Sequence, residues 1–246
     1  MKKIFSLMLL LATLLTFTAC SGDEPDNTKL SQTSYIMYHG DKQSVNGSNC
    51  SDIVWNSENE FVATVKNNVI TGQYVGKTTV KSATKNMIFS VEVKPRHFLF
   101  EEPCLDFGAS KAEIKSKRGT PTKEDATGLI YETGNANVPI ELYAFQNGEL
   151  YTCGVVCKLS AGNTLVDFLT ERYLTIKVDM DNYSANFMHC YGTFKDPKWD
   201  YALGMQYSSS MGGLLVAYME GDDKNTRSRS EIDFCSAFKS LESAIK

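Results

Sequence analysis

The histidines and cysteines have the most potential for chemistry in this chain of 246 residues, which contains 3 His and 7 Cys. A zinc site needs such ligands at helical or knuckle spacing. His189 and Cys190 are adjacent, so on a strand they point to opposite faces. Cys153, Cys157 and His189 would have to converge from neighbouring strands, at a spacing that matches no zinc pattern. We therefore predict no metal and no cofactor.

Thiol chemistry is the enzymatic alternative. A thiol hydrolase needs a cysteine beside His189 or His97, with an Asn or Asp that orients the imidazole. It predicts a cysteine and a histidine within about 4 Å of each other in one cleft. The sequence contains no Gly-rich phosphate loop, no Gly-x-Ser-x-Gly motif and no acid pair set apart for glycoside hydrolysis. We predict a non-enzymatic protein, with no catalytic residues, and keep a hydrolase with an unrecognised Cys/His site as the alternative.

Six cysteines remain when Cys20, discussed below, is set aside: Cys50, Cys104, Cys153, Cys157, Cys190 and Cys235. An even number in an exported protein permits disulfides, and buried free thiols are an equal alternative. Cys153 and Cys157 would share a strand face about 13 Å apart, which is too far for them to bond each other.

The best candidate binding residues lie in the polar stretch 195–201. It contains Lys198, Tyr201 and Trp199, one of only 2 tryptophans. Aromatic side chains in a loop can stack on sugars or anchor a partner protein. The competing interpretation is that Trp199 starts a strand and packs inward.

The first twenty residues have the parts of a secretory signal: Lys2 and Lys3, an apolar run over 4–15, and Ala19 before Cys20. The run is too short for a stable membrane-spanning helix, which needs about 20 residues. Thr18-Ala19-Cys20 resembles the lipobox of bacterial lipoproteins. That resemblance implies removal of residues 1–19 and acylation of Cys20, which would anchor the protein to a membrane.

An acidic, polar tether follows over 20–29, and it resembles the surface-export signal of Bacteroidetes lipoproteins. This predicts an outer-membrane protein at the cell surface, with the periplasmic face as the alternative. The formal net charge of −4 would become two units more negative when Lys2 and Lys3 are removed. Such a balance argues against nucleic acid as a partner.

Residues 30–95 carry strand signals throughout, at 35–38, 52–57, 61–65, 69–72, 77–83 and 87–93. Short strands separated by turns predict an all-β sandwich. The region resembles bacterial Ig-like group 2 domains in Trp55-x-Ser57, 62–65, 70–72, 75–80 and Val91-x-Val93. The resemblance implies that Trp55 is a core residue, and Asn68 stands where the family usually has Gly in a tight turn.

Residues 96–246 predict an α+β domain of helix plus three antiparallel strands, twice. The helices are expected at 110–119, where Ser110 and Glu113 form a capping box, at 165–174 after a cap at Asn163 or Thr164, and at 236–245. The strands are expected at 129–132, 140–145, 150–159, 185–194, 199–208 and 213–219, with a possible one at 231–234. The stretch 107–114 resembles the β-lactamase-inhibitor-protein-like group. Members of that group bind proteins through an open sheet face and are not enzymes.

These expectations combine into a multidomain, membrane-anchored lipoprotein. Its Ig-like sandwich would act as a spacer, and its α+β domain would bind a glycan or a protein. A third possibility is an inhibitor of a periplasmic enzyme, which a broad exposed apolar sheet face would favour.

Overall fold

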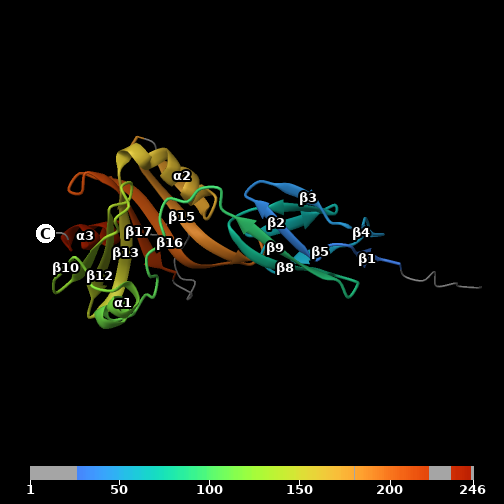
Figure 1. Ribbon diagram of the computed structural model, residues 1–246, viewed down its shortest axis with the longest axis horizontal. Helices are drawn as coiled ribbons and strands as arrows, with labels where there is room; N and C mark the ends of the chain where they lie inside the picture. Colours follow the sequence, from blue (N-terminus) through green and yellow to red (C-terminus); the bar gives the residue numbers. More distant parts are fainter. Residues whose placement is uncertain (1–26, 180, 222–233, 245–246) are drawn as a thin grey trace, which may run out of the picture.

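The computed structural model describes residues 27–179, 181–221 and 234–244. Two β-rich bodies lie along the long axis, with the first described residues at one end and the C-terminal helix at the other (Figure 1). Cys20 and most of the possible strand at 231–234 lie outside the described residues. Among the described residues, no helix has both the length and the apolar character that a membrane span requires.

The first body consists of two main sheets that enclose one core. One sheet has the order β2-β9-β8-β5, from Ser34–Tyr38, Ile88–Lys94, Gly76–Ser82 and Trp55–Ser57. The other has the order β3-β7-β6, from Lys42–Ser44, Val69–Gly72 and Ala63–Lys66. A short pair, β1 (Lys29–Leu30) and β4 (Gly47–Ser48), completes it. The pairing is antiparallel except between β2 and β9. Alternate residues of β2 and β9 are buried, as expected for strands with one face on a core.

Trp55 is a core residue in this body, at 6% exposure, and its ring lies 5.1 Å from that of Phe89. Asn67 and Asn68 both have positive φ, 50° and 61°, which suits a tight hairpin between β6 and β7. The Asn68 Oδ1 accepts a hydrogen bond from Trp55 Nε1 at 3.2 Å, and its Nδ2 donates to the Val45 carbonyl at 3.2 Å. Asparagine therefore satisfies the turn and also the buried indole, which glycine could not do.

The second body is built on an eight-stranded antiparallel sheet of order β10-β11-β12-β13-β17-β16-β15-β14. The first four strands are Lys123–Glu124, Gly128–Glu132, Ile140–Gln146 and Glu149–Cys157. The strands β14 to β17 are Leu174–Asp179, Ser184–Gly192, Pro197–Ser208 and Gly213–Glu220. Each set of four is a meander that follows a helix, and the two sets meet where β13 pairs with β17.

Helices cover both faces of this sheet. α1 (Lys111–Arg118) and α2 (Gly162–Thr170) pack on one face through Ile114 and Phe168. α3 (Cys235–Ser243) packs on the opposite face through Phe238 and Leu241. The capping box of Ser110 and Glu113 is present at the start of α1, as predicted.

The second half of the second body, from α2 onward, differs from the sequence expectation in three details. The helix predicted over 165–174 is α2, which runs from Gly162 to Thr170 and follows a 3-10 turn over Leu159–Ala161. Ala161 precedes the helix without a side-chain cap, so neither Asn163 nor Thr164 caps it. The run Leu174–Asp179 forms an additional strand, β14, because its β-branched residues favour a sheet. Each half therefore has four strands, although β10 has only two residues.

A buried glutamate ties the two bodies together. Glu171, at the end of α2, has a side chain only 4% exposed. Its carboxylate accepts hydrogen bonds from the backbone N–H groups of Arg96 at 2.9 Å and His97 at 3.0 Å. It also lies 2.5 Å from Arg172 Nη1, and its backbone carbonyl accepts from Val75 N–H. The peptide that links the bodies is thus held against α2.

A second set of contacts joins the bodies through the β15–β16 loop. The Glu60 N–H donates to the Gly192 carbonyl at 2.8 Å, and the Phe194 N–H donates to the Glu60 carboxylate at 2.6 Å. The rings of Phe61 and Phe194 meet edge to face at 5.0 Å. Because Phe61 also packs into the core beneath the α3 face, the junction is an extension of that core.

Candidate binding groove

The predicted binding residues share β16 but not a surface. A bulge opposes Cys190 to Trp199 and His189 to Tyr201, so Asp200 is an extra residue on its strand. Trp199 therefore packs on the α3 face of the sheet, and Tyr201 packs on the α1/α2 face. Lys198 is exposed between them. The strand begins at Pro197, and both aromatics are partly buried against a core.

Tyr201 belongs to a cluster of aromatic and ionisable side chains. His189 stacks on it at 4.8 Å with parallel rings, and the His189 Nδ1 lies 2.7 Å from the Asp200 carboxylate. The rings of Tyr173 and Tyr218 lie farther from the Tyr201 ring, at 6.0 Å and 6.3 Å between centroids. Burial raises the pKa of Tyr201 far above its usual range, so the phenol stays protonated at neutral pH. This cluster offers a positioned imidazole, but its tyrosine is a weak nucleophile.

Three of the cysteines offer little reactivity. All six in the described part of the chain are free thiols. Burial raises the pKa of Cys157 to about 11 and that of Cys153 well above its ordinary value, and burial also raises the pKa of Cys104. Since the thiolate is the nucleophile, these three thiols are poor candidates for covalent catalysis at neutral pH. Nowhere in the described ranges do three or more His, Cys, Asp or Glu side chains gather so that they could hold a metal ion.

A large apolar groove lies between α2 and the edge strand β14. Its volume is about 980 Å³, at the upper end of the range for ligand sites. One wall comes from α2 and the 3-10 turn before it, with Leu159, Val166, Asp167 and Thr170. The other comes from β14 and the hairpin after it, with Thr175, Val178, Asp179 and Tyr183. The floor is the sheet, with Ala185, Phe187, Met205, Tyr207 and Leu214.

Exposed apolar side chains concentrate at this groove. The described residues include eleven large hydrophobic side chains that are exposed, and five of them line it. The five are Leu159 at 54%, Val166 at 41%, Val178 at 54%, Tyr183 at 67% and Tyr207 at 43% exposure. Single exposed apolar residues are common on soluble proteins, but a contiguous set around a concave surface is typical of an interaction site.

Tyr183 adds a second, independent indication. Its φ is +47°, in the left-handed region, where a bulky side chain costs about 1 to 2 kcal/mol relative to its usual backbone conformations. Glycine or asparagine would be the ordinary choice at such a turn position. An aromatic residue is held there instead, and it is the most exposed of the five. Strain of this kind at a groove mouth is a reason to suspect function.

The charge of the groove is one-sided. Asp167 on α2 and Asp179 at the end of β14 face it from opposite walls, and among the residues that the structure describes its lining includes no Lys, Arg or His. Hydrogen bonds from Asn182, at 2.8 Å and 3.2 Å, hold the pKa of Asp179 below its ordinary value. This carboxylate is therefore ionised at neutral pH.

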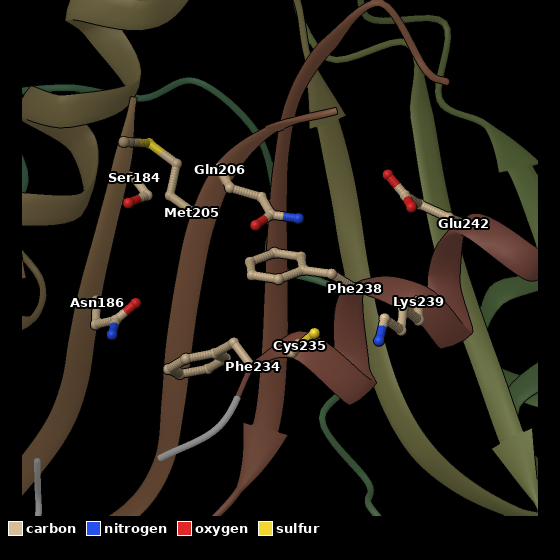
Figure 2. A pocket seen from close by; sticks show the side chains of 9 residues that line it. All are labelled: Ser184, Asn186, Met205, Gln206, Phe234, Cys235, Phe238, Lys239 and Glu242. Carbon is tan, nitrogen blue, oxygen red and sulfur yellow. The ribbon is translucent and has the colours of Figure 1, made fainter. Parts of the chain in front are cut away.

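The opposite face has a smaller and more polar hollow, of about 340 Å³. Figure 2 shows Asn186 and Gln206 on neighbouring strands, with Phe234 and Phe238 of the α3 segment facing them. The phenylalanines lie against Gly204, where a Cβ atom would come within 2.6 Å of the Phe234 ring. This hollow is thus the edge of a packed helix–sheet contact, and its lining side chains serve the α3 core.

Sequence reasoning missed the groove because it assigned apolar residues to cores. Leu165, Phe168 and Leu169 form the buried stripe of α2, as their helical spacing predicts. Val166 lies outside that stripe and is exposed, which is the one signal available in the sequence. Val178 lies in a strand that was not predicted.

Comparisons with known proteins add little to this geometry. No model of a known protein family matches the chain, and no curated protein matches it either. Among solved structures, the chain is similar to an extracellular protein containing a SCP domain from Bacillus anthracis str. Ames, with 12% sequence identity and a TM-score of 0.24. The similarity covers 52% of this chain and 50% of that chain, so this protein spans about half the length of its neighbour. Similarity at this level carries no argument about function.

Proposed function

We propose that this protein is a lipid-anchored, non-enzymatic binding protein of the cell envelope. An Ig-like sandwich over 30–95 acts as its spacer, and the α+β domain over 96–246 captures a protein partner in the apolar groove beside α2. Cys20 is the lipid-attachment residue, and the outer membrane is the proposed location. The concentration of exposed apolar side chains at one groove is the observation that carries this proposal.

The arrangement of the two bodies supports the spacer role. The first described residues lie at the end of the sandwich that is remote from the second body (Figure 1). A tether attached there would place the sandwich next to the membrane and the groove-bearing body beyond it. The bonds of Glu171 and Glu60 make the junction stiff, so the second body would be held out at a fixed angle.

A protein fits the groove better than a glycan. Sugar sites combine flat aromatic platforms with several hydrogen-bonding side chains, whereas Tyr207 is the only one of the five floor residues named above that carries a hydroxyl or amide group. Apolar side chains of a partner would replace water on that surface and contribute about 25 cal/mol for each Å² buried. Trp199, Lys198 and Tyr201 remain a separate proposal for a glycan contact, and Trp199 and Tyr201 lie on opposite faces of the sheet.

Site-specific photo-crosslinking in living cells tests the proposal. A benzophenone-bearing phenylalanine replaces Tyr183, which is 67% exposed in the groove, and the matched control replaces Ile88, which is 52% exposed on the sandwich. We expect a discrete protein adduct from position 183 and none of that size from position 88. Val166→Lys should abolish the adduct by placing a charge on the apolar wall. Equal adducts from both positions, or an adduct unaffected by Val166→Lys, would contradict the proposal.

A further inference from the structure

The charges around the groove indicate what kind of protein segment it takes. We infer that the partner segment is amphipathic and basic, with apolar side chains that fill the groove and a Lys or Arg that pairs with Asp167 and Asp179. This inference rests on the proposed function, because it concerns the same groove. It adds a chemical class of partner that apolar burial alone does not specify.

The two carboxylates are placed to select charge. They come from separate elements, the helix α2 and the edge strand β14, and both line the groove. The His97 imidazole Nε2 lies 4.0 Å from the Asp167 carboxylate, and the Asp167 side chain remains 58% exposed. Asp179 is oriented by Asn182, which donates two hydrogen bonds, and the charge of Lys177 on the same strand also acts on this carboxylate. Lys177 does not line the groove, whereas Asp179 does. An apolar segment with acidic residues would be repelled from both walls.

The alternative occupant is a second copy of this chain, because β14 is the edge of the sheet. Two features count against pairing of that edge. β14 has an irregularity between Thr175 and Lys177, and Lys177 is exposed on it. Bulges and lysines are the means by which natural sheets block edge-to-edge association. Both features disfavour pairing of two copies along β14, so our inference commits to a different chain as the occupant of the groove.

Three labelled peptides test the inference against the purified full chain by fluorescence anisotropy. They share one set of alternating Leu and Val residues, and their polar positions are all Lys, all Ser or all Glu. Exposed ion pairs are individually weak, so two of them should make the Lys peptide bind about fivefold tighter than the Ser peptide. The Glu peptide should bind more weakly than both, and about 0.5 M salt should remove most of the differences.

Isosteric variants assign the effect to residues. Asp167→Asn combined with Asp179→Asn should remove the advantage of the Lys peptide and leave binding of the Ser peptide unchanged. Asp196→Asn, an exposed carboxylate in the β15–β16 loop, is the matched control and should change neither. Val166→Lys should weaken binding of the Ser peptide.

The outcomes separate the two proposals. If the Lys and Glu peptides bind equally well and Val166→Lys weakens both, the groove is a binding site and the charge inference is wrong. If no peptide binds, or if Val166→Lys leaves the affinity of every peptide unchanged, the groove is not the binding site. If the chain forms a dimer in solution and Val178→Lys dissociates that dimer, the occupant is a second copy of the chain. The inference of a basic partner is then wrong.

Discussion

Removing the carboxylate of Glu171 tests whether the junction between the two bodies is rigid. Glu171→Ala deletes two charge-assisted hydrogen bonds to the backbone of Arg96 and His97 and leaves Arg172 without its closest acid. Hydrogen bonds to a charged group contribute about 1.5 to 3 kcal/mol each, and relief of the buried charge offsets part of that loss. The expected cost is about 3 to 5 kcal/mol of unfolding free energy.

Urea denaturation followed by tryptophan fluorescence measures this loss. Trp55 lies in the first body and Trp199 in the second, so one signal reports on both. With a urea dependence of roughly 2 to 3 kcal/mol/M, the midpoint should fall by about 1 to 2.5 M. Glu171→Gln keeps one acceptor oxygen, so its urea midpoint should fall by about half as much as that of Glu171→Ala. A midpoint for Glu171→Ala within about 0.2 M of the parent would refute the idea that this residue holds the junction.

Acid should reproduce the same loss in the parent protein. Burial alone would raise the pKa of Glu171, but hydrogen bonds from Arg96, His97 and Arg172 outweigh burial and hold the pKa below its ordinary value of 4.5. A carboxyl group with a lowered folded-state pKa stabilises the fold fully above its unfolded value, and that stability is lost as the pH falls through the folded value. The stability difference between the parent and Glu171→Gln should therefore be constant near pH 7 and shrink below pH 4.5.

Three further substitutions or modifications test the packing. Gly204→Ala should destabilise the protein by about 1 to 3 kcal/mol in a thermal melt, because the new Cβ would lie 2.6 Å from the Phe234 ring; an unchanged melting temperature would show that α3 moves freely. Asn68→Ala should cost about 1 to 3 kcal/mol, since alanine disfavours positive φ and leaves the Trp55 N–H unpaired, whereas Asn68→Gly should recover the turn but not the hydrogen bond. Iodoacetamide at pH 8 should leave Cys157 unmodified in the folded protein and modify it in urea, because burial raises its pKa to about 11; rapid labelling of the folded protein would contradict its placement in the core.

Local chemistry made several elements predictable from the sequence. The capping box at Ser110 and the tight turn at Asn68 each depend on residues within three positions of one another. The resemblance to Ig-like group 2 domains implied that Trp55 is a core residue, and Trp55 is buried, as expected for a large aromatic residue in a small core. Sequence patterns of this kind determine secondary structure well, since the determining contacts are short-range.

The groove was not predictable because it depends on where two distant elements end. α2 stops at Thr170 and the chain turns back into β14, which leaves a gap between the helix and the sheet edge. Whether Val178 or Tyr183 is buried in that gap depends on how far α2 extends across the sheet, which no local pattern encodes. The bulge at Asp200 was not predictable either. Its one extra residue places Trp199 and Tyr201 on opposite faces of the sheet, so the predicted binding residues do not share a surface.

Oxidative footprinting of tyrosines in intact cells tests the central claim most directly. Tyr183 and Tyr207 are 67% and 43% exposed in the groove, and Tyr38 on the sandwich, at 40%, is the internal control. All three should be oxidised readily in the purified protein. In cells, a captured partner should protect Tyr183 and Tyr207 while Tyr38 reacts as before. Equal oxidation of all three tyrosines in cells would contradict the account, because the groove would then be empty where the protein works.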